Sequence, residues 1–319
     1  MALARWWVPT SELGGGHSTA EAPFSEPVRA WFEAAFPEPT PAQAQAWPPI
    51  AAGEHTLLCA PTGSGKTLAA FLWAIDRLGQ DSRPAGGGTR VVYISPLRAL
   101  AVDVEKNLRS PIRGIELAAQ RLGGTFTAPT VGVRTGDTPP DERRKMARRP
   151  PDILVTTPES LYLLLTSAAR EGLAGVETVI VDEIHALAPT KRGAHLALSL
   201  ERLHAWVTRH DHPTPQRIGL SATQRPLETV AGFLGGREVN NAATKPRPVR
   251  IVDAGITKEL DLEVRVPVED MASLGTIIEE PQAGPAAAGP QRRGIWPSMH
   301  PALLELVERH PTIGFWKCY

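Results

Sequence analysis

"APTGSGKT", residues 60 to 67, follows an apolar stretch and precedes a segment with helical spacing. Gly63 and Gly65 let the backbone N–H groups turn inward around a phosphate, and the following helix adds its positive N-terminal end. Lys66 then supplies a charge to the β and γ phosphates, and the Thr67 hydroxyl supplies a magnesium ligand. Ala60 stands where the usual phosphate-binding loop has its first glycine. We expect the nucleotide to contact Thr62, Gly63, Ser64, Gly65, Lys66 and Thr67.

A second stretch, "VIVDEIHAL" (179–187), ends an apolar strand with two adjacent acids. Isolated charges at the end of a buried strand are costly unless something compensates them. In enzymes with this kind of phosphate-binding loop, an acid at a neighbouring strand end holds magnesium and a second group positions the attacking water. We therefore assign Asp182 to Mg²⁺, through a water, and Glu183 to orienting and deprotonating the nucleophilic water.

The composition favours a soluble globular protein. The chain has 319 residues, of which 42% are hydrophobic, and 34 basic residues balance 34 acidic ones. Without a global positive field, any contact with nucleic acid must be local. Cys59 and Cys318 lack metal-ligand spacing, which favours a reducing cytoplasm. Residues 1–22 form a leader without an apolar core of signal-peptide length, and no run is long enough to span a bilayer.

Short apolar runs alternate with helical patterns, which predicts an α/β fold with a mostly parallel sheet and helices on both faces. The expected strands are 55–60, 90–95, 130–135, 152–157, 178–183 and 217–223. The expected helices are 65–78, 96–108, 158–165 and 192–207. Ligands should bind at the carboxyl ends of these strands. The basic run 143–149 is interpreted as a solvated helix face, with a phosphate contact as the alternative. Residues 235–249 are expected to form turns or connectors, and 281–294 a low-complexity linker.

"APTGSGKT", "DEIH" (182–185) and "SAT" (221–223), in this order, resemble motifs I, II and III of superfamily 2 helicases, the DEAD/DEAH group. "EPTPAQAQAW" (38–47) resembles the Q motif, "SPLRAL" (95–100) motif Ia and "TTPESLYLLL" (156–165) motif Ib, while "RTGDT" (134–138) resembles a further nucleic-acid loop. The resemblance extends over about residues 24 to 310 and is strongest to the large helicase-related (Lhr) family. It implies a P-loop NTPase domain of the RecA-like type.

The resemblance also implies residue roles. Gln43 would bind the adenine edge, with Phe24 stacking on the base. Ser221 and Thr223 would couple the two sites through hydroxyl bonds to His185. The expected nucleic-acid contacts are Arg98, Thr157 and Glu159. A solvated arginine remains the alternative for Arg98, and helix capping, alone or in addition, for the other two. The implied cofactors are ATP and Mg²⁺, and the implied partner is single-stranded DNA or a 3′-tailed duplex, with movement from 3′ to 5′.

The resemblance divides the chain at specific residues. A RecA-like domain is expected over 23–245, a strand-containing connector and linker over 246–294, and the start of a second RecA-like domain, a helix and then a strand, over 295–319. Motifs IV, V and VI and an arginine finger are missing from the sequence, so we expect a truncated, frameshifted or fragmentary second domain. Two other functions remain open: a nucleotide-gated clamp or inhibitory fragment without catalysis, and, disfavoured by "DEIH" and "SAT", a small-molecule kinase.

Overall fold

A parallel sheet forms the centre of the fold in the computed structural model, which describes residues 24–81, 87–222, 225–240, 243–255, 299–300, 303–305 and 308. Its seven strands follow the order β3-β4-β2-β5-β6-β1-β9, and every pairing is parallel. The strands are β1 (Thr56–Cys59), β2 (Val91–Ile94), β3 (Val131–Arg134), β4 (Ile153–Thr156), β5 (Thr178–Val181), β6 (Gln216–Ser221) and β9 (Arg250–Asp253). The six strands predicted from the sequence are therefore confirmed.

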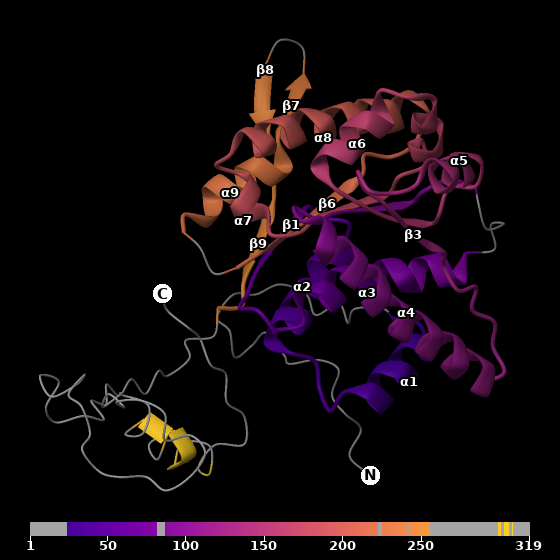
Figure 1. The fold of residues 1–319 in the computed structure, drawn as a ribbon, viewed down its shortest axis with the longest axis vertical. Helices are drawn as coiled ribbons and strands as arrows, with labels where there is room; N and C mark the ends of the chain where they lie inside the picture. The colour runs from indigo at the N-terminus through magenta and orange to yellow at the C-terminus, as the bar shows by residue number, and fades with distance from the viewer. Residues whose placement is uncertain are drawn as a thin grey trace, which may run out of the picture. The chain divides into compact units, whose positions relative to one another are not determined.

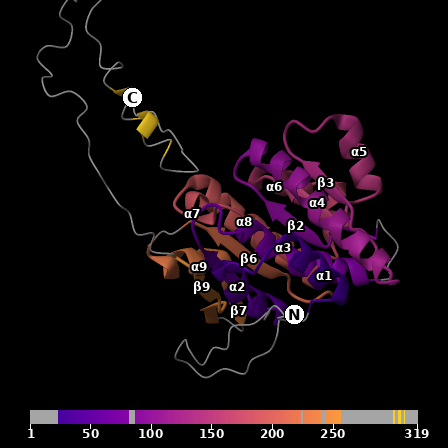
Figure 2. The same cartoon turned by 90° about the horizontal axis from the view of Figure 1, so that it is seen from below.

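Helices cover both faces of this sheet (Figures 1 and 2). One face packs against α1 (Glu26–Ala35), α2 (Pro41–Ala51), α3 (Lys66–Gln80) and α4 (Arg98–Arg121). The other packs against α6 (Pro158–Leu165), α7 (Ile184–Leu187), α8 (Lys191–Arg209) and α9 (Leu227–Gly235), with the 3-10 helix η2 (Ala168–Leu173) beside them. Successive strand residues alternate between the two cores, so that Leu58 faces α3 while Leu57 and Cys59 face the opposite layer.

Helix α5 (Pro140–Arg148) flanks the edge strand β3. None of its residues is buried, which confirms the prediction of a solvated helix in this run. Met146 nevertheless lies against Gly132, where an added Cβ would come within 3.3 Å of its methyl carbon. The loop before α5 is fastened by Arg143, which donates to the carbonyl oxygens of Gly136 and Thr138 at 2.7 and 2.8 Å.

The segment after α9 differs from its expected structure. Where turns or connectors are predicted, β7 (Arg237–Asn240) and β8 (Ala243–Pro246) pair as antiparallel strands. Residues 250–253, which the sequence places in the connector, form β9 and pair with β1. Contacts divide the chain into units Met1–Ile256 and Thr257–Tyr319, so the first unit takes in this strand. The connector is expected to contain a strand, but the short, mostly exposed pattern of β9 does not indicate which residues form it or which strand they pair with.

A buried ion network fastens β9 and its preceding residues to the body of the domain. Glu201 on α8 accepts hydrogen bonds from Arg217 at 3.0 Å and from Arg247 at 2.7 and 2.8 Å. The two arginine side chains are only 3% and 8% exposed, whereas that of Glu201 is 37% exposed. Both arginines also donate to the carbonyl oxygen of Gly235 at the end of α9. One carboxylate thus accepts hydrogen bonds from two buried guanidinium groups.

The second unit is described at few positions. Residues 299–300, 303–305 and 308 are helical, in the segment where a helix is expected. The expected leader over 1–22, the linker over 281–294 and the strand expected after this helix lie outside the described residues. In the part of the chain that the structure describes, no helix is both long and apolar enough to cross a bilayer.

Candidate nucleotide and nucleic-acid site

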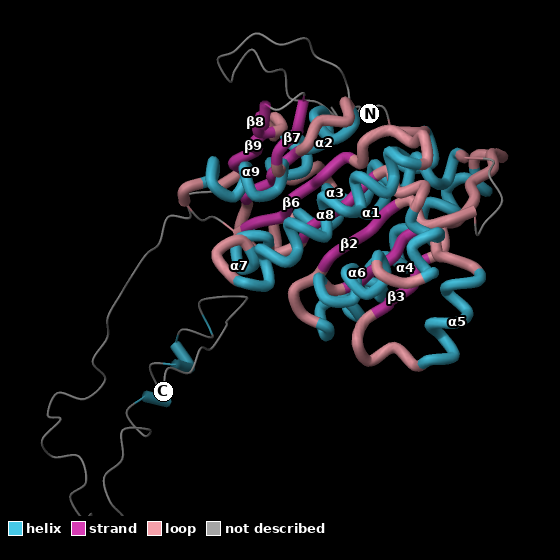
Figure 3. Tube along the Cα trace, turned by 90° about the horizontal axis from the view of Figure 1, so that it is seen from above, coloured by secondary structure: helices cyan, strands magenta, loops and turns pink. Residues whose placement is uncertain are grey.

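The strand order sorts the sequence motifs into two groups, and Figure 3 shows β6 and β9 on one side of the sheet and β2 and β3 on the other. Strands β5, β6 and β1 are neighbours, and their carboxyl ends carry "DEIH", "SAT" and "APTGSGKT". Strands β2, β4 and β3 are also neighbours, and their carboxyl ends carry the three loops that resemble nucleic-acid motifs. In a parallel sheet these ends lie along one edge, where ligands bind. The two groups therefore share an edge and meet between β5 and β2.

The loop after β1 has the backbone that phosphate binding requires. Gly63 and Gly65 both have φ of 78°, in the left-handed region where glycine is strongly favoured. Ser64 Oγ donates to the Pro61 carbonyl at 2.7 Å and closes the turn. Thr62 and Gly63 are exposed at its tip. This loop leads directly into α3, whose first N–H groups lack intrahelical partners and can bind an anion.

Lys66 and Thr67 occupy the first turn of α3. The Lys66 ammonium donates to the carbonyl oxygens of Ala60 and Pro61, the latter at 3.1 Å, so it lies over the phosphate-binding loop. Burial lowers the pKa of Lys66, and the negative charges of Glu183 and Asp182 oppose this shift. The ammonium and the two acids therefore lie close enough to interact electrostatically, although they come from separate strand ends.

Asp182 is held in one orientation by two hydrogen bonds. Its Oδ1 accepts from the backbone N–H of Glu183 at 2.9 Å, and its Oδ2 accepts from the Tyr93 hydroxyl. Asp182 is 9% exposed and lies at the edge that also bears the Thr67 hydroxyl. Carboxylate and hydroxyl oxygens are ligands that suit Mg²⁺, which usually keeps waters and phosphate oxygens as its other ligands. The residues present therefore fit a magnesium ion.

Tyr93 was not predicted from the sequence. It is fully buried, and its ring stacks on Phe71 of α3 with centroids 5.1 Å apart. Burial raises the pKa of the Tyr93 phenol, and the charge of Asp182 raises it further, so the hydroxyl keeps its proton and donates it to the carboxylate. In the sequence, "VVYI" is indistinguishable from an ordinary buried strand; only the pairing of β2 with β5 gives the hydroxyl its role.

Glu183 has an unusual backbone. Its φ and ψ of 46° and 40° place it in the left-handed region, as the residue before α7. Such a conformation is uncommon for a non-glycine residue and concentrates at functional sites. Glu183 Oε2 lies 3.3 Å from His185 Nε2, and its side chain remains 31% exposed. The carboxylate is thus partly accessible to water at the same edge as Lys66.

The contact between His185 and the loop after β6 differs from expectation. His185 Nδ1 accepts a hydrogen bond from the backbone N–H of Ala222 at 3.2 Å. The fully buried Ser221 instead donates its hydroxyl to the Ala222 carbonyl, so the expected hydroxyl bond from Ser221 to His185 is wrong. The reason is geometric: Ser221 is the last residue of β6, and its side chain is buried inside the sheet edge. Thr223 lies outside the described residues.

Gln43 lies against the phosphate-binding loop. Thr40 and Gln43 form a capping box at the start of α2, in which Gln43 Oε1 accepts from the Thr40 backbone N–H at 2.9 Å. Thr40 Oγ1 in turn donates to the Ser64 carbonyl at 2.7 Å. A Cβ on Gly65 would lie 2.6 Å from Gln43 Nε2, so the amide occupies space that only glycine leaves free. The adenine contact expected of Gln43 stays a prediction.

Phe24 does not have the environment expected of an adenine-stacking ring. It is only 5% exposed and belongs to the core between α1, α2 and α3. Its ring makes edge contacts with Trp47 and Trp73, with centroid distances of 4.9 and 6.1 Å. These contacts and the burial leave little of the ring open to a base, and the stacking role expected of Phe24 stays a prediction. The position of Phe24 upstream of Gln43 in the sequence gives no indication that its ring is buried.

Arg98 and Asp137 join two of the three nucleic-acid loops. Arg98 Nη1 donates to Asp137 Oδ1 at 2.6 Å, and the side chains are 62% and 68% exposed. A Cβ at Gly136 would lie 2.9 Å from the Arg98 guanidinium, so the guanidinium packs against the backbone of this loop. Exposed pairs of this kind contribute little to stability. Arg98 therefore remains free to exchange its carboxylate partner for a phosphate.

Thr157 and Glu159 have structural partners at the start of α6. Thr157 is 4% exposed, and its hydroxyl accepts from the backbone N–H of Ser160 at 3.4 Å, which confirms the capping alternative. Glu159 forms two hydrogen bonds with Arg192, at 2.6 and 3.2 Å, and the bond from Arg192 lowers the pKa of Glu159. Arg192 also donates to the Pro96 carbonyl at 3.0 Å. This arginine, missed in the sequence, ties the β2 and β4 loops together.

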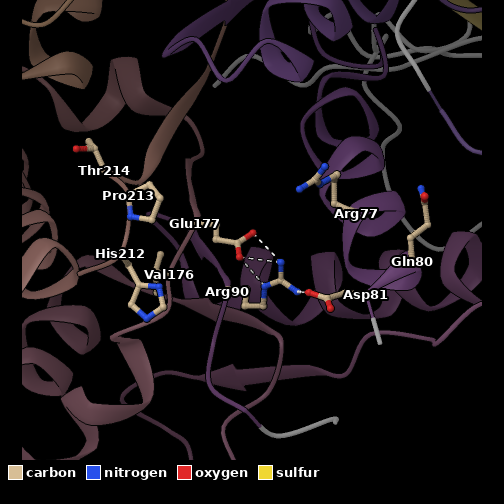
Figure 4. A pocket seen from close by; sticks show the side chains of 9 residues that line it. All are labelled: Arg77, Gln80, Asp81, Arg90, Val176, Glu177, His212, Pro213 and Thr214. Atoms are coloured by element: carbon tan, nitrogen blue, oxygen red, sulfur yellow. Dashed lines mark hydrogen bonds and ion pairs between the residues drawn. The ribbon is translucent and has the colours of Figure 1, made fainter. Parts of the chain in front are cut away.

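A hollow of about 570 Å³ lies at the amino ends of β2 and β5, on the edge opposite the phosphate-binding loop (Figure 4). Arg90 projects into it and is paired with Glu177 at 2.8 and 2.9 Å and with Asp81 at 2.6 Å. The three charged groups satisfy one another. The hollow therefore contributes nothing to the nucleotide site.

Comparison with known proteins identifies the family. Residues 40–230 match the family model "DEAD/DEAH box helicase". The chain is 55% identical over 287 residues to "Lhr helicase/ probable uracil glycosylase" of Mycolicibacterium smegmatis and 49% identical over 303 residues to "Lhr helicase/uracil glycosylase" of Escherichia coli. These alignments cover 90% and 92% of this chain but only 17% and 18% of the relatives.

Solved structures agree with this assignment. The structure of the Mycobacterium smegmatis helicase Lhr bound to ssDNA and AMP-PNP superposes with a TM-score of 0.70 at 54% identity, over 90% of this chain and 33% of that chain. The helicase MrfA, at 23% identity and a TM-score of 0.57, shares the fold. The family match extends from the capping box at Thr40 to α9 and includes both groups of strand ends described above. The chain therefore belongs to the DEAD/DEAH box helicase family, and its sequence is strongly similar to that of Lhr helicases.

Proposed function

We propose that this chain is the first motor domain of an ATP-dependent DNA helicase of the Lhr type, which binds Mg-ATP and single-stranded DNA along one edge of its sheet. The observation that carries the proposal is the convergence of Lys66, Asp182 and Glu183 at this edge, next to the loops of β2, β4 and β3. The similarity to an Lhr structure that contains ssDNA and AMP-PNP supports both ligands. Movement from 3′ to 5′, a 3′-tailed duplex as substrate and a cytoplasmic location are parts of the same proposal.

In this proposal, the reaction is in-line attack of water on the γ-phosphorus. The backbone N–H groups of residues 62–67 and the Lys66 ammonium bind the phosphates. Glu183 orients the water and accepts its proton as the new P–O bond forms and the bond to the bridging oxygen of ADP breaks. Thr67 and Asp182 would hold Mg²⁺, which neutralises charge on the phosphate oxygens. Gln43 would contact the adenine edge.

The nucleic-acid half of the proposal uses backbone contacts. Arg98 would exchange Asp137 for a phosphate, while the loop N–H groups near Thr157 would hold the sugar-phosphate chain. The Glu159–Arg192 pair would keep the β2 and β4 loops at a fixed separation. Contacts of this kind hold DNA without reading its bases, so binding should depend little on sequence.

The test is single-turnover ATP hydrolysis by the purified 319-residue chain, with and without single-stranded DNA, beside direct binding of a fluorescent ATP analogue. Glu183→Gln should bind the analogue as the wild type does but lose hydrolysis by at least about 100-fold, the scale of general-base catalysis. Glu142→Gln, an exposed glutamate on α5, is the matched control and should change neither measurement. Lys66→Ala should lose binding itself.

Two outcomes would contradict the proposal. Binding without any hydrolysis that Glu183→Gln reduces would favour a nucleotide-gated clamp over an enzyme. Transfer of the phosphate to a metabolite rather than water would favour a kinase. Hydrolysis that single-stranded DNA stimulates and Glu183→Gln abolishes would support the motor-domain function.

A further inference from the structure

Tyr93 joins three parts of the site through one side chain. Its strand, β2, ends in the loop that carries Arg98, its ring stacks on Phe71 of the helix that follows the phosphate-binding loop, and its hydroxyl donates to Asp182. The strand alternation explains the geometry: Tyr93 and Ile180 pair in register on the face toward α3, and Asp182, two residues beyond Ile180 and directly after β5, points to the same side. The phenol is long enough to reach this carboxylate.

Packing alone does not require a tyrosine at this position. Phenylalanine would fill the same space between β2 and α3 and would keep the stack on Phe71. A buried hydroxyl, by contrast, must find a partner, because an unpaired polar group costs free energy in the interior. The Tyr93 hydroxyl donates to Oδ2 of Asp182, the residue proposed to bind magnesium. The hydroxyl therefore contributes to the site rather than to the core.

Each of the two hydrogen bonds on Asp182 holds one oxygen of its carboxylate. The bond from the Glu183 N–H holds Oδ1, but alone it would allow the carboxylate to turn about its Cβ–Cγ bond. The bond from Tyr93 holds Oδ2 and stops this rotation. Groups that hydrogen-bond to a metal ligand fix its direction and raise its effective affinity, and their loss typically costs 10–100-fold in metal affinity or activity.

We propose that Tyr93 is a positioning residue that holds the Asp182 carboxylate in the orientation needed to bind Mg²⁺ with the nucleotide. The inference rests on the proposed function, because it assumes a Mg-nucleotide at this edge. It adds a residue outside the "DEIH" motif, contributed by the strand that leads into the nucleic-acid loops.

The experiment is a magnesium titration of nucleotide binding by the full 319-residue chain. A fluorescent, non-hydrolysable ATP analogue is bound first in EDTA and then at increasing Mg²⁺, and the Mg²⁺ concentration at half-maximal enhancement is recorded. For Tyr93→Phe this midpoint should rise by about 10–100-fold, while affinity for the analogue in EDTA stays within about twofold of wild type. Tyr162→Phe is the matched control, because this tyrosine lies at the surface of α6, and it should shift neither value.

Each outcome distinguishes among the possible roles. An unchanged midpoint in Tyr93→Phe would overturn the proposal, and so would an equal loss of affinity with and without Mg²⁺, which would indicate a packing role. Asp182→Asn should raise the midpoint strongly by itself, and adding Tyr93→Phe to it should have little further effect. Absence of any Mg²⁺-dependent binding in the wild type would contradict the proposed function itself, before Tyr93 is tested.

Discussion

Replacing Glu201 by glutamine should destabilise the first unit by about 2 kcal/mol, although the residue lies outside the nucleotide site. The substitution removes the negative charge that faces two buried guanidinium groups and weakens three charge-assisted hydrogen bonds. Breaking a buried ion pair on one side costs about 3–5 kcal/mol. We reduce this figure because Glu201 is partly exposed and because both arginines keep the Gly235 carbonyl as an acceptor.

The assay is urea unfolding followed by far-UV circular dichroism at pH 7, with Glu38→Gln as the matched control at an exposed loop position. Burial would raise the pKa of Glu201, but the hydrogen bond from Arg247 and the charge of Arg217 together hold it below its ordinary value. A lowered carboxyl pKa gives stability that is present above the unfolded pKa, near 4.3, and lost as the pH falls through the folded pKa. The difference between wild type and variant should therefore shrink below about pH 4. A loss no larger than that of Glu38→Gln at pH 7 would refute the reasoning.

Three further predictions concern separate parts of the fold. Burial and then the charge of Arg217 lower the pKa of His55 to about 4. The contribution of neutral His55 to the free energy of unfolding is therefore full above about pH 6.5 and is lost as the pH falls. Between pH 7 and 5 the free energy of unfolding should drop by about 1–2 kcal/mol, discounted for partial exposure, and His55→Gln should make this drop smaller. Gly65→Ala should abolish binding of a fluorescent ATP analogue, because φ is 78° and the new Cβ would lie 2.6 Å from a neighbouring amide, whereas Gly175→Ala, with open space, should bind normally. Arg98→Gln should weaken single-stranded DNA binding equally for all sequences and reduce the salt slope of log K by about 0.7, while Arg148→Gln on the solvated α5 should leave the slope unchanged; unequal losses among sequences would contradict a phosphate contact.

The regular elements could be predicted because each has a strong local signal. The strands around 56–59 and 178–181 are apolar runs that end in chemically distinctive loops, and α3 has helical spacing after a glycine-rich turn. A strand is expected in the connector, but neither the residues of β9 nor its partner could be predicted, because its burial pattern is mostly exposed and it pairs with a strand almost 200 residues earlier. Local sequence patterns indicate helices and strands well, but they do not indicate which strands pair with each other in a sheet.

The same division applies to the site. Lys66 and the acids of "DEIH" belong to contiguous motifs, so their sequence context was sufficient to place them at one edge. Tyr93 and Arg192 act on residues far away in the chain, and their roles follow only from the strand order and from the packing of α8 on α6. Phe24 differs from these residues, because the resemblance suggests a ring that stacks on a base, whereas tertiary packing buries the ring.

The position of β1 in the sheet has a consequence for the order in which this domain is assembled. β1 carries the phosphate-binding loop, yet its two neighbours, β6 and β9, begin at residues 216 and 250. During synthesis from the N-terminus, the strand that supports the nucleotide site therefore has no sheet partner until most of the domain has left the ribosome. Contacts this distant in sequence form slowly, because a long loop must be closed before they are made. The nucleotide site, encoded first, is thus expected to be among the last parts of the domain to become structured.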